Sequence, residues 1–192
     1  VGFPELGSSL CTLGVSPSAF GRGSAASGSS RAVAPTPDHG FVSRTARMRH
    51  VLFVCSGNFY RSRFAEAVFN FHASRIDAPC RAFSRGLATH LVAGAGDLSP
   101  HTREGLGARG IPLHHTGPVP VSLSRADLDR ALRVIALKEA EHRPLMREQF
   151  PDWEQRVQYW TIHDIDAAAP ADALPLLEQR VITLLHEIRT GG

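Results

Sequence analysis

The sequence predicts an α/β fold in which helices cover both faces of a four-stranded parallel sheet. From residue 48 onward, short apolar runs of strand length alternate with longer segments whose apolar residues recur at helical spacing. Such alternation is typical of a parallel sheet, because parallel strands need long crossover connections that are usually helices. In folds of this class, ligands bind outside the carboxyl ends of the strands.

The first three elements follow directly in the chain. The run VLFV at 51–54 predicts a buried strand, and the segment 61–74 carries apolar residues near one helical face. A second strand is expected at 81–86, RAFSRG. The chain therefore begins its folded part as strand, helix, strand.

A second helix is expected to begin after Ser99. Serine is a favoured N-cap residue, and Pro100 then occupies the first helical position, where proline is well tolerated. Gly110 is expected to close this helix before Ile111.

The second half of the domain repeats the alternation. LRVIAL at 132–137 predicts a buried strand, and EAEHRPLMREQF at 139–150 predicts a helix that ends near Pro151. VQYWTI at 157–162 predicts the fourth strand, and leucines and other apolar residues at helical spacing across 174–188 predict a final amphipathic helix.

Residues 1–47 differ in composition from the rest of the chain. They are rich in Ser, Gly, Ala and Pro, poor in acids and without sustained periodicity, so we expect a disordered or non-native N-terminal extension before a domain at 48–192. A transit peptide has a similar composition, but the glycines and prolines disfavour its amphipathic helix. We favour Met48 as the natural start, because a strand begins directly after it.

Charge and hydropathy exclude two classes of partner. The net charge is +3, and residues 1–47 hold four arginines against two acids, so the remaining chain is almost neutral. It contains no run of basic residues, which argues against nucleic acid as a partner. No apolar run approaches the roughly 18 residues of a membrane span, so we expect no membrane partner either.

Cysteine and histidine spacing predicts no metal and no cofactor. The three cysteines, Cys11, Cys55 and Cys80, show no CxxC spacing, and the ten histidines form no HExxH motif. Without a signal peptide, and with a reduced thiol required at Cys55, we expect a cytoplasmic protein. No feature of the sequence indicates an oligomeric state.

An anion-binding loop is expected directly after the first strand. Cys55 follows the strand, and Arg61 begins the next helix, where a positive charge is unfavourable unless an anion is present. The amides of the loop and of the helix N-terminus would converge on one point, and Arg61 adds a planar fork of donors. Gly57 allows a tight curl, and Asn58 tolerates a left-handed conformation.

The same surroundings favour the thiolate form of Cys55, which is the nucleophilic form. The alternative is a buried structural cysteine with an unrelated arginine, because the pattern C-x5-R is short. Its position between a strand and a helix favours the functional interpretation.

The stretch VLFVCSGNFYRSRFAEAVF at 51–69 resembles the phosphate-binding loop and first helix of the low-molecular-weight protein tyrosine phosphatases, in their bacterial form. Their signature is C-x5-R-S/T after an N-terminal strand. Weaker similarity continues in SRGL at 84–87, SPHTREGLGARGI at 99–111 and YWTIHDID at 159–166. The resemblance extends from Met48 to about His186.

The resemblance implies a two-step mechanism through a phosphocysteine on Cys55, with Arg61 and the loop amides holding the phosphate oxygens. Ser62 matches the family's hydroxyl that hydrogen-bonds the thiolate, although a serine at a helix start also satisfies backbone groups. The implied substrate-binding residues are Ser56, Gly57, Asn58, Phe59 and Tyr60.

The resemblance also implies a general acid in a loop after the fourth strand. Asp164 occupies the position of the family's aspartate, but Ile165 replaces the proline that normally follows it. Asp166 is therefore a competing candidate, and both acids are alternatively solvated loop residues.

Two residues in or next to the loop depart from the family pattern. Tyr60 replaces the second cysteine of many eukaryotic members, and Arg63 stands where proline is common. Arg63 is expected at the pocket mouth, where it would favour acidic substrates, or as a solvated surface residue. Phe59 and Tyr60 either form an aromatic wall for the pocket or pack against the core.

We therefore expect a metal-independent phosphomonoester hydrolase, acting on phosphotyrosine in proteins or on small aryl phosphates. The first alternative is an arsenate reductase that relies on an external thiol, since Cys80 alone accompanies Cys55 in the domain. The second is a phosphate- or phosphoprotein-binding module without turnover. A rhodanese-type sulfurtransferase fits less well, because its cysteine lies late in the domain.

Overall fold

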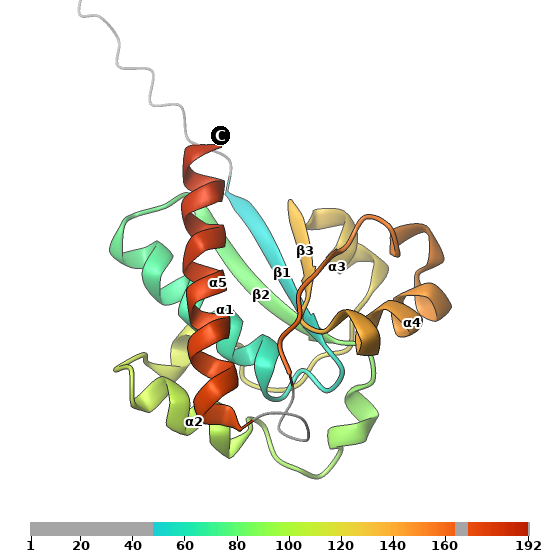
Figure 1. The fold of residues 1–192 in the computed structure, drawn as a ribbon, viewed down its shortest axis with the longest axis horizontal. Helices are drawn as coiled ribbons and strands as arrows, with labels where there is room; N and C mark the ends of the chain where they lie inside the picture. The colour runs from blue at the N-terminus through green and yellow to red at the C-terminus, as the bar shows by residue number, and fades with distance from the viewer. Residues whose placement is uncertain (1–47, 164–168, 192) are drawn as a thin grey trace, which may run out of the picture. The chain divides into compact units, whose positions relative to one another are not determined.

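The computed structural model describes residues 48–163 and 169–191. Within them, four parallel strands form one sheet in the order β2-β1-β3-β4, with helices on both faces (Figure 1). The strands are β1 (Arg49–Cys55), β2 (Cys80–Gly86), β3 (Arg133–Ala136) and β4 (Gln158–Tyr159). The helices are α1 (Arg61–Arg75), α2 (Pro100–Gly107), α3 (Arg125–Arg130), α4 (Glu139–Gln149) and α5 (Pro170–Thr190), with 3₁₀ turns η1 (Thr89–Val92), η2 (Leu113–His115) and η3 (Pro151–Trp153). The predicted fold class is confirmed.

Alternate residues of β1 enter two different hydrophobic cores. Val51 and Phe53 pack in the core that also contains the buried faces of α1 and α5. Leu52 and Val54 point the other way, into the core beneath α3 and α4. A strand covered on both faces has no solvent side, which explains why its sequence is continuously apolar.

Three elements differ from the sequence-based expectation. β4 spans only 158–159, although Trp160 and Ile162 continue to donate backbone hydrogen bonds to the neighbouring β3 side of the sheet. Ser99 is the N-cap residue of α2, but its side chain makes no capping hydrogen bond. The six-residue helix α3 was not expected from the sequence, because its stability comes from a capping box between Ser124 and Asp127 rather than from an apolar period.

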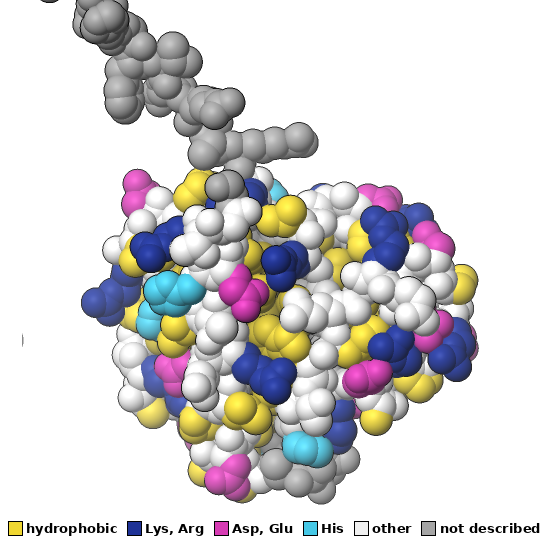
Figure 2. Space-filling model, turned by 45° about the horizontal axis from the view of Figure 1, so that its top comes forward, with side chains coloured by type: hydrophobic (Ala, Val, Ile, Leu, Met, Phe, Trp, Pro, Cys, Tyr) yellow, Lys and Arg dark blue, Asp and Glu magenta, His cyan; other side chains and the backbone are white. Residues whose placement is uncertain are grey.

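The surface mixes charges of both signs. Figure 2 shows basic and acidic side chains interspersed with apolar ones over the face that it displays. None of the helices in the described part of the chain combines the length and the apolar character needed to cross a lipid bilayer.

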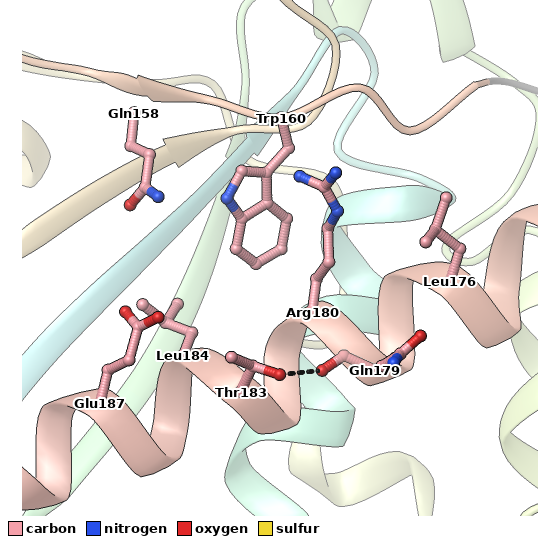
Figure 3. A pocket seen from close by; sticks show the side chains of 8 residues that line it. All are labelled: Gln158, Trp160, Leu176, Gln179, Arg180, Thr183, Leu184 and Glu187. Atoms are coloured by element: carbon pink, nitrogen blue, oxygen red, sulfur yellow. Dashed lines mark hydrogen bonds between the residues drawn. The ribbon is translucent and has the colours of Figure 1, made fainter.

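A hollow of about 380 Å³ lies between β4 and α5. In Figure 3, Trp160 faces the helix, where Arg180 lies across its ring at 5.9 Å from the centroid. Leu176 stands on the helix at the end of this hollow and is 42% exposed, whereas the next residue, Leu177, is fully buried.

Leu177→Ala is predicted to lower the free energy of unfolding by about 2–5 kcal/mol, because it removes buried methyl groups and leaves a cavity in the core that α5 shares with α1. Leu176→Ala is the matched control on the same helix and is expected to change it by less than about 0.5 kcal/mol. Urea denaturation measures both, and equal losses would contradict this packing.

Candidate active site

The predicted nucleophile and its partners meet where β1 ends and α1 begins. Cys55 is the last residue of β1, and Arg61 and Ser62 are the first two residues of α1. The side chains of all three are almost completely buried, and Cys55 Sγ lies 3.0 Å from Ser62 Oγ. The structure therefore brings together the cysteine, the arginine and the serine that the sequence singled out.

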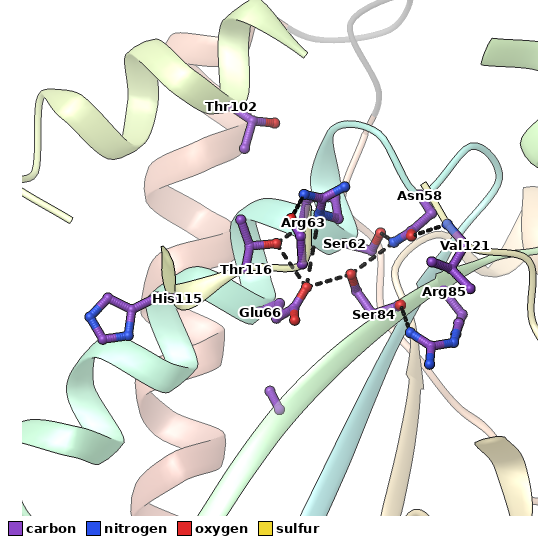
Figure 4. Close-up of polar contacts among 12 residues, drawn as sticks. Asn58, Ser62, Arg63, Glu66, Ser84, Arg85, Thr102, His115, Thr116 and Val121 are labelled. Carbon is purple, nitrogen blue, oxygen red and sulfur yellow. Dashed lines mark hydrogen bonds and ion pairs between the residues drawn. The ribbon is translucent and has the colours of Figure 1, made fainter. Parts of the chain in front are cut away.

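Asn58 ties the loop to the rest of the domain. It adopts the expected left-handed backbone conformation, with φ of 52°. Its Nδ2 donates to Ser62 Oγ at 3.1 Å and to Ser84 Oγ at 2.8 Å, while its Oδ1 accepts from the amide of Val121 at 2.8 Å (Figure 4). One buried amide side chain thus anchors the loop to α1, to β2 and to the segment before α3.

Gly86 lets the loop lie directly against the end of β2. A Cβ at this position would meet the Ser56 carbonyl oxygen at 2.7 Å and the Asn58 amide nitrogen at 2.9 Å. Both are backbone atoms of the loop and cannot rotate away. The close approach of two backbones at the site therefore requires glycine.

Gly57 has a different reason for its lack of a side chain. A Cβ there would lie 2.7 Å from a methyl group of Val92 in η1. Glycine was expected here because it allows a tight curl of the backbone. In the structure, the Val92 side chain is what leaves no room for a Cβ.

A carboxylate from α4 holds Arg61. Glu141 Oε2 accepts from both terminal nitrogens, Nη1 and Nη2, at 3.1 Å, and Oε1 accepts from Nη2 at 3.1 Å. Nη1 also donates to the carbonyl of Ile162 at 3.3 Å. The Ser56 hydroxyl donates to Glu141 Oε1, so the same carboxylate contacts the loop.

The surroundings of Glu141 keep it ionised. Burial opposes ionisation, but hydrogen bonding with His142, the charge of Arg61 and the hydrogen bond from Ser56 hold the pKa of Glu141 well below its usual range. Sequence reasoning missed this residue. The available signal was its position just after β3, at the same edge of the sheet as Cys55.

The Arg63 side chain is buried, so Arg63 is not the solvated surface residue that was one of the two expectations for it. Its side chain is 1% exposed, and its Nε donates to Thr116 Oγ1 at 2.7 Å. The other guanidinium nitrogens donate to the carbonyls of Asp97 and Gly117. The segment around 116–117 folds over this face of α1 and buries it.

Glu66 completes the polar cluster behind the loop. It lies 3.9 Å from Arg63 and accepts from Ser84 Oγ at 2.7 Å and from Thr116 Oγ1 at 2.8 Å (Figure 4). Burial raises the pKa of Glu66, although its hydrogen bonds and Arg63 oppose that shift. Since Ser84 also binds Asn58, hydrogen bonds run without a break from the loop to this buried carboxyl group.

The two aromatic residues of the loop take different environments. Tyr60 is 6% exposed and belongs to the core on the α1 side, where its ring meets His101 edge-on at 6.1 Å. Phe59 is half-buried, and its carbonyl accepts from the amide of Ser99. Of the two alternatives, core packing applies to Tyr60.

The predicted general acids, Asp164 and Asp166, lie outside the described residues. Among the described residues before them, Ile162 is fully buried and its carbonyl accepts a hydrogen bond from the Arg61 guanidinium. Across the described ranges 48–163 and 169–191, no group of three or more His, Cys, Asp or Glu side chains is arranged to hold a metal ion.

Comparison with known proteins assigns the family. The family model for low molecular weight phosphotyrosine protein phosphatase matches residues 50–188, and the chain belongs to this family. The resemblance noted in the sequence is therefore confirmed. Membership places the chain among phosphatases that act on phosphorylated substrates.

Individual relatives differ in what they act on. A protein-arginine-phosphatase of Bacillus subtilis (strain 168) is 28% identical over 124 residues, which cover 65% of this chain and 77% of that protein. The crystal structure of YfkJ from Bacillus subtilis has a TM-score of 0.65 at 24% identity and covers 77% of this chain and 98% of its own. The structure of a thioredoxin-dependent arsenate reductase of Corynebacterium glutamicum has a TM-score of 0.57 at 19% identity. The match covers 77% of this chain and 65% of that chain. These two solved structures, both under 25% identical to this chain, share its fold.

Gly86→Ala is predicted to lower kcat/KM for p-nitrophenyl phosphate roughly tenfold to a hundredfold, because the new methyl group displaces the loop backbone at a site where small misplacements are costly. Gly107→Ala is the control, since a Cβ there meets nothing within 4 Å. Steady-state kinetics on both variants checks the prediction. Equal kinetics for Gly86→Ala and the wild type would contradict the close approach.

Proposed function

We propose that the chain is a metal-independent phosphomonoester hydrolase that removes phosphate from phosphotyrosine in proteins through a phosphocysteine on Cys55. The observation that carries the proposal is the 3.0 Å contact between Cys55 Sγ and Ser62 Oγ beside buried Arg61, in a chain of this family. A thiol, a hydroxyl and a guanidinium at a helix N-terminus are the groups that thiolate attack on a phosphate requires.

In the first step, the Cys55 thiolate attacks phosphorus in line with the ester oxygen. A sulfur–phosphorus bond forms, the phosphorus–oxygen bond to the leaving group breaks, and the loop amides with Arg61 stabilise the oxygens of the transferring group. The leaving oxygen takes a proton from an aspartic acid, which we assign to Asp164, with Asp166 as the alternative.

In the second step, water attacks the phosphocysteine. The aspartate formed in the first step accepts a proton from this water, the sulfur–phosphorus bond breaks, and inorganic phosphate is released. The Ser62 hydroxyl, placed at hydrogen-bond distance from Cys55, stabilises the departing thiolate.

Hydrolysis of p-nitrophenyl phosphate is predicted to continue in EDTA and to fall to background in Cys55→Ser. The rate of hydrolysis is expected to fall roughly a hundredfold or more in Asp164→Ala and by a smaller factor in Asp166→Ala. Cys80→Ala is the control, because Cys80 lies at the start of β2, at the opposite end of the strand from the site. Turnover by Cys55→Ser at the wild-type rate would contradict thiolate chemistry. Phosphate binding without turnover in the wild type would favour the binding module.

Phosphoarginine is the second candidate substrate, supported by the 28% identity with a protein-arginine-phosphatase. Arsenate reduction has the support of fold similarity alone, and Cys80, the other cysteine in the described part of the chain, lies at the far end of β2.

A phosphotyrosine peptide is predicted to be turned over with a kcat/KM at least about tenfold above that of a matched phosphoarginine peptide, because half-buried Phe59 offers an apolar surface beside the loop for an aromatic ring. Release of phosphate from the two peptides under identical conditions measures the ratio. A ratio below one would reassign the substrate to phosphoarginine and leave the thiolate mechanism in place.

A further inference from the structure

We propose that Glu141 is a positioning residue for the phosphate-binding arginine, holding the Arg61 guanidinium and the Ser56 hydroxyl at the outer edge of the loop. This inference rests on the proposed function and adds a residue from a different element to its site. Glu141 belongs to α4, which begins directly after β3, and it lies 80 residues along the chain from Arg61.

The contacts restrain the guanidinium at its outer end. Both terminal nitrogens of Arg61 donate to the Glu141 carboxylate, and Nη1 also donates to the Ile162 carbonyl. Two acceptors from two different segments fix both the position and the plane of the fork. A phosphate then meets an arginine whose orientation is already set, so binding loses less side-chain entropy.

Ser56 indicates on which side of the loop the carboxylate stands. In an anion-binding loop the backbone amides point toward the anion, so the side chains point outward. The Glu141 carboxylate contacts the Ser56 side chain, and Asn58 likewise directs its side chain away, to Ser84. Glu141 is therefore placed beside the anion cradle as a support.

Charge and burial show why such a support is required. The Arg61 side chain is 1% exposed, whereas that of Glu141 is 30% exposed. A buried guanidinium without an anionic partner is costly whenever no phosphate is bound. The low pKa of Glu141, to which His142, Arg61 and Ser56 contribute against the effect of burial, keeps the carboxylate charged at neutral pH.

The test is the affinity for inorganic phosphate, measured by calorimetry on the full chain, together with steady-state kinetics on p-nitrophenyl phosphate. Glu141→Ala is expected to weaken phosphate binding about tenfold to a hundredfold, the range expected for hydrogen bonds to a charged group. KM should rise and kcat should fall, because the same guanidinium binds the ground state and the transition state. Glu141→Gln, which keeps one acceptor oxygen and the side-chain volume, is expected to recover part of the loss.

Glu139→Ala is the matched control on the same helix. The Glu139 side chain is 54% exposed and pairs with Arg143, away from the loop. It is expected to leave phosphate affinity and kinetics unchanged. Thermal denaturation of all three variants shows whether each is folded at the assay temperature. If Glu141→Ala is not folded, the phosphate affinity of Glu141→Gln tests the proposal.

Two results would overturn the proposal. Tighter phosphate binding by Glu141→Ala would mean that the carboxylate competes with the anion for Arg61. Unchanged phosphate binding in both Glu141 variants would mean that the pair does not act on the site. The affinity for phosphate is independent of turnover, so absence of hydrolysis in the wild type would refute the proposed function and leave this comparison intact.

Discussion

A buried positive charge at the start of a helix is the constraint on which the rest of the site depends. Arg61 opens α1 with its side chain almost fully buried, and the first turn of that helix contains no acidic residue. The helix N-terminus is itself electropositive, so the local sequence provides nothing to neutralise this point. The compensation comes from elsewhere in the chain through Glu141 and, in the proposed function, from the substrate phosphate.

The loop keeps its shape because three kinds of contact act on it from behind. Gly86 permits direct backbone approach from β2, and Asn58 adopts a left-handed conformation that its own hydrogen bonds stabilise. Glu66 and Arg63 then form a buried polar cluster that joins α1 to the segment around 116–117. A polar cluster in which every group has partners favours one arrangement over its alternatives. This rigidity presents the loop amides to an anion before it binds.

The sequence predicted the parts of the site that are contiguous in the chain. The apolar run, the small and left-handed-tolerant residues and the helical period place Cys55, Asn58 and Arg61 without reference to distant segments. Glu141 could not be recognised in this way, since an acid in the first turn of a helix has a sufficient local explanation in the helix dipole. Arg63 was misplaced because its burial depends on a segment more than fifty residues away. The end of β4 was likewise predicted too late, because its pairing with distant β3 defines where the strand stops. The short helix α3 was missed for a different reason, since it begins with a local capping box and has no apolar period.

Mass spectrometry of protein quenched in denaturant during turnover tests most directly whether Cys55 carries the phosphoryl group. Peptide mapping of wild-type protein, quenched while p-nitrophenyl phosphate is in excess, is predicted to find one phosphoryl group on the peptide that contains Cys55. This phosphoryl group should be absent when substrate is omitted, and it should be absent from the peptide that contains Cys80. Sustained turnover with no phosphoryl group on Cys55, under conditions that preserve a synthetic phosphocysteine standard, would contradict the mechanism.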